Sequence, residues 1–266
     1  MVTKPMQGTT EIEIKGAVPD VLAYQFSDGG WEKITTNIPD EMELTVYINS
    51  QELVRILCTP AKLNCLVLGF LYTQGIISSV SDVASMRVCE DDSLADVKLN
   101  NPQFELPKLR TLTSGCGSGA TFVSEGQKVD SSLVVSPGDV LSLMKHFQEK
   151  MELYRFCRGV HASALADKKE ILVLAEDIGR HNTLDKIQGE CLLRKLSTKD
   201  RLLFSTGRIS SEMLFKAAKM QIPVILSRSS PTGRAVTLAQ ELGITLVGYV
   251  RGNRMTVYTH PERLGY

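Results

Sequence analysis

The chain has 266 residues, 43% of them hydrophobic, so it can bury a full core and needs no disulfide framework to fold. Thirty basic residues balance thirty acidic ones, which argues against an overall attraction to nucleic acid or to anionic lipid. No apolar run has the length of a signal peptide or a membrane span, so we expect a cytoplasmic protein, and the six cysteines, without a CxxC pair, are expected to be free thiols.

The N-terminal part is predicted to be rich in β-structure. We interpret about the first twenty residues as a tail or a loosely attached edge. Alternating apolar and polar residues then predict a hairpin of two strands at residues 44–48 and 53–58. Thr59 and the proline after it are typical of a helix start, and apolar residues at helical spacing continue to Gly75. Two further strand-like runs, VASMRVCE and ADVKLN, lead to a glycine-rich loop.

From Ser136 onward, helical and strand patterns alternate along the chain. This order is typical of βαβ crossovers and predicts an α/β fold with a mixed, mainly parallel sheet and helices on both faces. The predicted strands are residues 170–175, 201–205, 222–227, 244–250 and 255–260, and the helices between the first four are residues 181–195, 209–220 and 232–242.

These patterns predict that the chain is divided into three parts. They are a β-rich N-terminal part with one helix at residues 1–112, a mobile glycine loop at residues 113–130, and an α/β part that binds the ligand at residues 131–266.

Arginine collects in the loops that follow the predicted strands of the α/β part. Ligands of open α/β sheets bind beyond the carboxyl ends of the strands, where glycine allows close approach and arginine matches phosphate oxygens. A single loop arginine is most often simply solvated, but the set predicts an anionic ligand, a nucleotide or a dinucleotide. The six residues are Arg180, Arg208, Arg228, Arg234, Arg251 and Arg254.

The segment EDIGRHNTLDKIQG, residues 176–189, carries the densest set of polar residues. Glu176 and Asp177 precede a glycine turn, and we expect both at the mouth of the ligand cleft. Arg180 and His181 open the next helix. We interpret His181 as a base, a ligand contact or a structural residue that bonds a neighbouring loop.

His161 begins the triplet HAS, which invites comparison with the HxE half of a zinc deaminase motif. The glutamate is absent, and no PCxxC follows to supply further zinc ligands. We therefore expect no metal site, and a histidine that is either buried and hydrogen-bonded or lines the ligand cleft.

Cys116 lies in TSGCGSGA, where glycine and serine give it no apolar neighbours. Cys65 and Cys191 lie on or beside apolar helical faces, and Cys58 and Cys89 lie in predicted strands, as expected for resting thiols. An exposed thiol close to positive charge is reactive. We therefore predict a chemical role for Cys116, on a loop able to present the sulfur to more than one partner.

Together these segments resemble the formate dehydrogenase accessory family, FdhD/NarQ. The resemblance is carried by DEMELTVYINSQELVRILC, TSGCGSG, GVHASAL, EDIGRHNTLDKIQG, STGRISSEMLFKAAK and LVGYVRGNRMTVYTHPERL, in family order from about Asp40 to the C-terminus. It implies a three-layer fold related to the cytidine deaminases, without their zinc, together with the β-rich N-terminal subdomain.

For function, the resemblance implies a cytoplasmic sulfur carrier required for formate dehydrogenase activity. Such proteins accept sulfur from a cysteine desulfurase as a cysteine persulfide. They pass it to bis-molybdopterin guanine dinucleotide before this cofactor enters the catalytic subunit of formate dehydrogenase, and we expect a guanine nucleotide such as GDP to bind the same site. Relatives suggest a homodimer. The alternatives are a molybdenum-cofactor chaperone without sulfur transfer and, more weakly, a nucleotide hydrolase or deaminase.

The resemblance also places residues. The persulfide cysteine of the family falls on Cys116, and its C-terminal cofactor-binding segment falls on Tyr249, Val250, Arg251, Gly252, Asn253 and Arg254. Loop position and resemblance add Asp177, Arg180, His181, Ser205, Gly207 and Arg208 as cofactor contacts. The family loop commonly reads CxxC, and here Gly119 takes the second position. This excludes an internal disulfide, leaves a single persulfide possible, and also fits a paralogue that only binds the cofactor.

Overall fold

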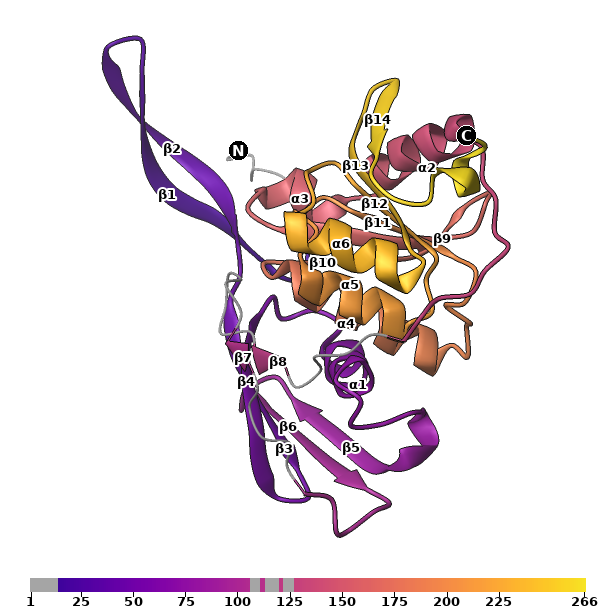
Figure 1. Ribbon diagram of the computed structural model, residues 1–266. Coiled ribbons are helices and arrows are strands. Elements are labelled where there is room, and N and C mark those ends of the chain that lie inside the picture. Colours follow the sequence, from indigo (N-terminus) through magenta and orange to yellow (C-terminus); the bar gives the residue numbers. More distant parts are fainter. Residues whose placement is uncertain (1–13, 106–110, 113–119, 122–126) are drawn as a thin grey trace, which may run out of the picture.

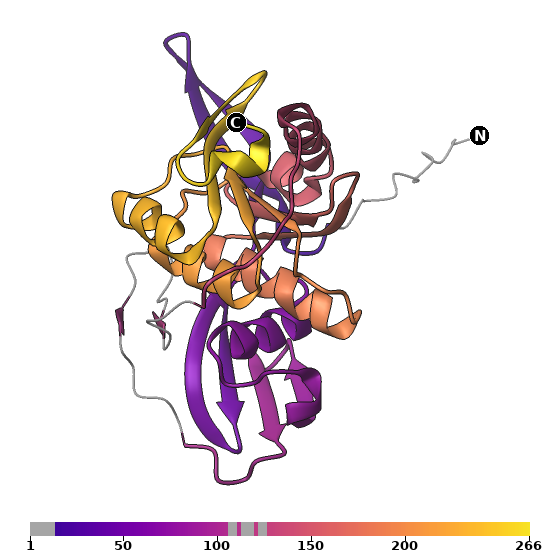
Figure 2. The same cartoon turned by 45° about the vertical axis from the view of Figure 1, so that its right-hand side comes forward.

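The computed structural model describes residues 14–105, 111–112, 120–121 and 127–266. An α/β layer lies above a smaller N-terminal sheet, with the helix α1 at their junction, and a long hairpin projects from the upper part (Figures 1 and 2). No helix in this part of the chain is long and apolar enough to cross a membrane.

The projecting hairpin consists of β1 (Ala17–Ser27) and β2 (Gly30–Pro39), which pair antiparallel. We call residues 17–39 the arm. Its turn residues, Asp28 and Gly29, both have positive φ (50° and 82°), the conformation that favours an Asp-Gly hairpin turn. We had interpreted about the first twenty residues as a tail or a loosely attached edge, whereas β1 begins at Ala17.

The N-terminal sheet has the strand order β4-β3-β6-β5. The predicted hairpin of β3 and β4 is confirmed, and β3 also pairs parallel with β6. One face of the sheet packs against α1 and forms a separate apolar core. The elements are β3 (Met42–Ile48), β4 (Gln51–Cys58), α1 (Leu63–Thr73), a short 3-10 helix η1 (Val80–Asp82), β5 (Val83–Cys89) and β6 (Leu94–Leu99).

The predicted start of α1 at Thr59 is wrong. The helix begins at Leu63, and the residue before it, Lys62, has positive φ (53°). Thr59 has another role, because its N–H donates to the Asp177 carboxylate and its Oγ1 accepts from the N–H of Ile178, both at 3.1 Å. Its side chain is therefore committed to a contact between the two parts of the chain and does not cap the helix.

The α/β sheet has the order β10-β9-β11-β12-β13-β14. It is mixed, as predicted, but the mainly parallel pairing is not found: only β11–β12 and β12–β13 pair parallel, while β10–β9, β9–β11 and β13–β14 pair antiparallel. Two of the antiparallel pairings arise from β9, a strand that we did not predict and that separates β10 from β11, and the third is the β13–β14 hairpin. The strands are β9 (His161–Ala166), β10 (Ile171–Asp177), β11 (Leu202–Ser205), β12 (Val224–Ser227), β13 (Thr245–Arg251) and β14 (Arg254–Val257).

Helices cover both faces of this sheet and give the expected three layers. On β11, Leu203 faces the core formed with α4, α5 and α6, whereas Leu202 and Phe204 face the core formed with α2. Ser136 caps α2 as predicted, by accepting from the N–H of Asp139. The helices are α2 (Pro137–Glu149), α3 (Glu152–Cys157), α4 (Arg180–Leu193), α5 (Ser211–Lys219), α6 (Gly233–Leu242) and the 3-10 helix η2 (Pro261–Leu264).

Helices α1 and α4 cross with their backbones in direct contact. A Cβ atom on Gly69 of α1 would overlap the carbonyl oxygen of Asp185, and a Cβ on Gly189 of α4 would overlap the carbonyl oxygen of Cys65. Each helix therefore offers a glycine to the other at the crossing. Since α4 also covers the α/β sheet, this crossing fixes the N-terminal sheet to the rest of the molecule.

We predict that Gly189→Ala destabilises the protein. Alanine usually favours a helix over glycine by roughly 1 kcal/mol, but here the added methyl group forces the two helices apart, and overpacking typically costs about 1–3 kcal/mol. Urea unfolding measures the free energy. The matched control is Gly233→Ala in α6, where a Cβ would meet nothing within 4 Å. Equal stability of the two variants would contradict the close crossing.

Candidate site at the carboxyl ends of the strands

The loops that follow β11 and β12 are joined by hydrogen bonds. Ser227 Oγ donates to the Gly207 carbonyl oxygen (2.6 Å), and the N–H of Arg228 donates to the Ser205 carbonyl oxygen (3.1 Å). Ser205 is fully buried, and its Oγ accepts from the N–H of Gly207 at 3.2 Å. Ser205 is therefore a buried residue that holds the loop containing Gly207 in place.

The β13–β14 hairpin continues the same edge. The N–H of Tyr249 donates to the Ser229 carbonyl oxygen (3.1 Å), and Arg251 Nε donates to the Arg228 carbonyl oxygen (2.7 Å). The Arg251 guanidinium also lies 5.8 Å from the centre of the Tyr249 ring, within the range of a cation–π contact. The loops after β11, β12 and β13 thus form one continuous surface, which we call the carboxyl-end surface.

Within the predicted C-terminal segment, side chains differ in their access to a ligand. Residues 251–254 are exposed at the tip of the hairpin, where Gly252 has positive φ (55°). Tyr249 is 43% exposed and also has positive φ (53°). Val250 is buried in the core that α2 covers, so its side chain supports the hairpin from within.

The loop after β10 joins this surface through Gly207. A Cβ atom at Gly207 would lie 3.2 Å from Arg180 Cβ and 3.3 Å from His161 Nδ1. A Cβ here would be tight against both side chains, so glycine suits this position, and Arg180 and His161 come together beside it. His161, at the start of β9, is half-buried and borders the site, consistent with one of its two predicted places.

The arginines that the sequence places on this edge differ in exposure. Arg208, Arg234, Arg251 and Arg254 are exposed, whereas Arg180 is buried. Arg228 is half-buried, and its Nε is enclosed without a hydrogen-bond partner among the described residues. A buried donor of this kind is costly unless it is satisfied, and a bound anion is one way to satisfy it.

His181 faces α5. Its Nε2 lies 3.3 Å from Ser210 Oγ and 3.2 Å from a carboxylate oxygen of Glu212. Burial, together with the nearby charges of Lys216 and Arg180, lowers the pKa of His181 to about 2. Burial also raises the pKa of Glu212. The histidine is therefore neutral at physiological pH and bonds a neighbouring helix, which is one of the roles open from the sequence.

Asp177 is not at the mouth of a cleft, contrary to the expectation. The side chain is fully buried and forms an ion pair with Lys186 at 2.6 Å. Its second carboxylate oxygen accepts from the N–H of Gly179 and from Asn182 Nδ2, both at 2.8 Å. Together with the bond from Thr59, these contacts engage both oxygens of Asp177. Its place suits a positioning role in the loop that carries Arg180.

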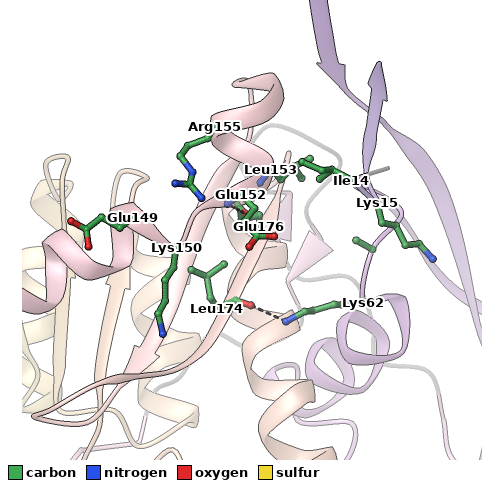
Figure 3. Close-up of a pocket in the computed structure, with 11 residues that line it drawn as sticks. Ile14, Lys15, Lys62, Glu149, Lys150, Glu152, Leu153, Arg155, Leu174 and Glu176 are labelled. Carbon is green, nitrogen blue, oxygen red and sulfur yellow. Dashed lines mark hydrogen bonds between the residues drawn. The ribbon is translucent and has the colours of Figure 1, made fainter. Parts of the chain in front are cut away.

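Glu176 is also engaged, on the other side of β10. Its carboxylate accepts three backbone N–H bonds of 2.8 to 3.1 Å from the first turn of α3. It lines a cavity of about 750 Å³, which lies between the base of the arm, β10 and the α2–α3 junction (Figure 3). The arginine residues of the carboxyl-end surface do not line this cavity.

Five of the six cysteines lie in the described part of the chain, all as free thiols. Burial raises the pKa of Cys58 and of Cys191 to about 12, and it also raises the pKa values of Cys65 and Cys157. Cys89 is half-buried, and its thiol donates to Asp92 at 3.0 Å.

Cys116 lies outside the described residues. The short strands β7 (Thr111–Leu112) and β8 (Ala120–Thr121) precede and follow it in the chain and pair antiparallel with each other. The predicted persulfide position therefore stays a prediction.

Sequence reasoning did not select Glu212, and it named Arg228 only as one of a set. The N-terminal signal of α5 is present in the sequence, because Ser210 caps the helix and Glu212 lies in its first turn. Nothing in the sequence pairs Glu212 with His181, which precedes it by about thirty residues. No group of three potential metal-ligating side chains occurs among the residues that the structure describes.

We predict that mild acid destabilises the protein partly through His181. The unfolded chain takes up a proton at this residue near pH 6.5, whereas the folded chain does not until a much lower pH. Stability should therefore fall as the pH decreases below 6.5, by up to about 1.4 kcal/mol per pH unit for this group. Protonation of Glu212 partly offsets the loss, because its pKa is raised on folding.

Urea unfolding at several pH values between 6.5 and 5.5 measures this effect. His181→Asn should flatten the dependence on pH, and His146→Asn, on the exposed side of α2, should leave it unchanged. An unaltered slope in the His181 variant would contradict the assignment of a buried neutral imidazole.

Two comparisons with known proteins, by family model and by sequence, point to one family over nearly the whole chain. The FdhD/NarQ family model matches residues 39–265. "Sulfur carrier protein FdhD" of Bacillus subtilis is 38% identical over 256 residues, which are 93% of this chain and 97% of that protein. The protein of the same name from Listeria monocytogenes is 38% identical over 261 residues, covering 92% and 99% of the two chains.

A solved structure has the same fold. A crystal structure from Desulfotalea psychrophila, named as that of a candidate formate dehydrogenase accessory protein, superposes with a TM-score of 0.75 and 24% identity over 93% of this chain and all of that one. With the family model and the relatives extending over nearly its full length, the chain belongs to the FdhD/NarQ family.

Proposed function

We propose that this protein is a sulfur carrier that supports formate dehydrogenase in the cytoplasm and works as a homodimer. It receives sulfur from a cysteine desulfurase on Cys116 and passes it to bis-molybdopterin guanine dinucleotide, which it binds as cargo before the catalytic subunit of formate dehydrogenase takes up the cofactor. The observation that supports this most directly is the similarity, over more than nine-tenths of the chain, to proteins named sulfur carriers.

The carboxyl-end surface has the chemistry that an anionic dinucleotide needs. Arg208, Arg251 and Arg254 are exposed along it and can pair with phosphate oxygens. Arg228 Nε offers an enclosed donor that the described protein groups do not satisfy. These residues therefore fit the diphosphate part of the proposed cargo, with Asp177 and Ser205 holding the loops in place.

The properties of the other thiols support Cys116 as the carrier of sulfur. A thiolate is the nucleophile in sulfur transfer, and four of the five described cysteines have raised pKa values that disfavour it. In the sequence, Cys116 is flanked by glycine and serine on both sides, with no apolar residue beside it.

The proposed transfer has two steps. The Cys116 thiolate attacks the terminal sulfur of the donor's persulfide, a new S–S bond forms, and the donor cysteine leaves as a thiolate. The terminal sulfur then moves from Cys116 to molybdenum in the cargo, and Cys116 returns to a thiolate. The second step reduces the transferred sulfur, so it requires two electrons from reduced molybdenum. Neither step needs a second cysteine, so the glycine at position 119 does not prevent sulfur transfer.

Gly119 also favours a second candidate function. A protein that binds and delivers the cofactor without adding sulfur has no use for a second loop cysteine. This chaperone shares the arginine surface with the carrier and differs only in whether Cys116 reacts.

Sulfur loading tests the carrier directly. After incubation with a cysteine desulfurase and cysteine, we expect mass spectrometry to find one added sulfur atom on Cys116. Cys116→Ala should lose this sulfur and fail to support formate dehydrogenase activity, whereas Cys89→Ala, which removes a half-buried thiol, should behave as the unmodified protein. Full formate dehydrogenase activity with Cys116→Ala would leave the chaperone as the function.

Nucleotide affinity tests the arginine surface separately. We expect GDP to bind, and replacement of both Arg251 and Arg254 by Gln to weaken binding by at least about tenfold, because hydrogen bonds between charged groups contribute about 1.5–3 kcal/mol each. The control replaces Arg87 and Lys98, exposed on the N-terminal sheet, by Gln and removes the same charge. Isothermal titration calorimetry measures the affinities, and unchanged binding in the first variant would refute this placement.

A further inference from the structure

The strand β9 brings a further loop to the carboxyl-end surface. Because β9 runs antiparallel to both β10 and β11, it begins at the edge where those two strands end, with His161 opposite Asp177 and Ser163 opposite Ser205. The segment that precedes β9, residues 158–160, therefore enters the sheet at this edge. We did not select it from the sequence, because it precedes a strand that we did not predict.

This segment leads into a contact with the loop after β11. The N–H of Ala162 donates to Thr206 Oγ1, and the N–H of Thr206 donates to the Ala162 carbonyl oxygen, both at 3.0 Å. Arg158 lies four residues before this contact in the chain, and Arg208 lies two residues after it. Both arginine side chains are exposed. The two loops that carry them therefore meet at the same edge of the sheet.

The backbone at Arg158 has a conformation that glycine normally occupies. Its φ is 59° and its ψ is −157°, a combination that is essentially restricted to glycine. The N–H of Arg158 donates to the Tyr154 carbonyl oxygen at 2.9 Å, which fixes this conformation from the side of α3. Next to it, Gly159 is packed so closely that a Cβ there would lie 3.1 Å from Pro39. A large side chain kept at such a conformational cost points to a function for that side chain.

The guanidinium group of Arg158 has a supporting ring but no acidic partner. Its central carbon lies 5.2 Å from the centre of the Tyr154 ring, within the range of a cation–π contact. Within the described ranges of the chain, Arg158 forms no ion pair with a carboxylate. A guanidinium that is held by a ring and not neutralised by an acid is well suited to bind the oxygens of an anion.

We propose that Arg158 binds a phosphate group of the nucleotide ligand, together with Arg208. This inference rests on the nucleotide-binding part of the proposed function and adds the loop before β9 to the carboxyl-end surface. Paired strands lie about 4.8 Å apart, and β9 pairs directly with β11. The long side chains of the two arginines can therefore reach one phosphate group from neighbouring loops. Arg158 is a binding residue and has no part in the sulfur-transfer steps.

Nucleotide affinity tests the proposal. Isothermal titration calorimetry should show that Arg158→Gln weakens the binding of GDP by at least about tenfold, because hydrogen bonds between charged groups are lost. Inorganic diphosphate should show the same loss, since the contact is to phosphate and not to the base. The matched control is Arg155→Gln, which removes the same charge from an exposed side chain of α3 that lines the cavity beside Glu176 (Figure 3). This control should bind both ligands as the unmodified protein does.

Arg158→Gly separates the effect of the backbone from that of the side chain. Glycine adopts this conformation without steric cost, whereas glutamine keeps the strain. The glycine variant should therefore unfold at a higher urea concentration than Arg158→Gln. It should nevertheless bind GDP as weakly as Arg158→Gln does. A residue that only supports the end of α3 would change stability and leave the affinity for GDP unaltered.

Several results would overturn the proposal. One is an unchanged affinity for GDP in Arg158→Gln, and another is an equal loss in Arg155→Gln, which would indicate a general effect of charge. A third is weaker binding of GDP with unchanged binding of inorganic diphosphate, which would assign Arg158 to another part of the nucleotide.

Failure of this inference can be distinguished from failure of the proposed function. Arg158→Gln should still accept one sulfur atom on Cys116 from a cysteine desulfurase. If the double variant of Arg251 and Arg254 loses affinity for GDP while Arg158→Gln does not, the arginine surface stands and this inference alone is wrong. If the unmodified protein does not bind GDP, the inference and the nucleotide site both fail, whatever the result of sulfur loading.

Discussion

The buried ion pair between Asp177 and Lys186 is the contact on which the arrangement of this protein depends. Both side chains are fully enclosed, and Lys186 also donates to the carbonyl oxygens of Thr59 and Glu176. The pair thus connects the end of β4, the end of β10 and the first half of α4. Loss of one partner from a buried pair leaves an uncompensated charge, which is strongly destabilising. The position of the β10–α4 loop, and with it that of Arg180, therefore depends on a contact with the N-terminal sheet.

The carboxyl-end surface follows from this arrangement together with the strand order. Backbone carbonyl oxygens hold three of its loops together. The carbonyl oxygen of Arg228 accepts from Arg251 Nε, that of Ser229 accepts from the N–H of Tyr249, and that of Ser205 accepts from the N–H of Arg228. Much of the surface is therefore set by main-chain geometry, and the exposed guanidinium groups remain available to a ligand. The site combines a rigid base with long side chains that can adapt to a large anion.

Much of the fold could be predicted from the sequence, because apolar periodicity reports burial directly. The alternation from Ser136 onward and the β3–β4 hairpin are examples. Residues whose role depends on distant partners could not be predicted in this way. Thr59 has the signature of a helix cap but bonds Ile178, and Asp177 has the signature of a cleft residue but pairs with Lys186. The arm was missed although its Asp-Gly turn is a hairpin signal, because its apolar side chains face solvent and give no burial pattern.

The site was predictable to the same extent. The position of these loops directly after the predicted strands indicated that they meet at one edge, and the contacts of Gly207 and Arg228 agree with this. The pairing of His181 with Glu212 needs the packing of α4 against α5, which no local pattern encodes.

The burial of most thiols has a consequence for how such a chain tolerates its surroundings. A protein that carries sulfur as proposed here would risk modification wherever a second thiolate forms. With the pKa of Cys58 and of Cys191 near 12, these sites hold almost no thiolate under physiological conditions. The interior of the described part of the chain therefore offers few thiolates with which electrophilic sulfur or mild oxidants can react.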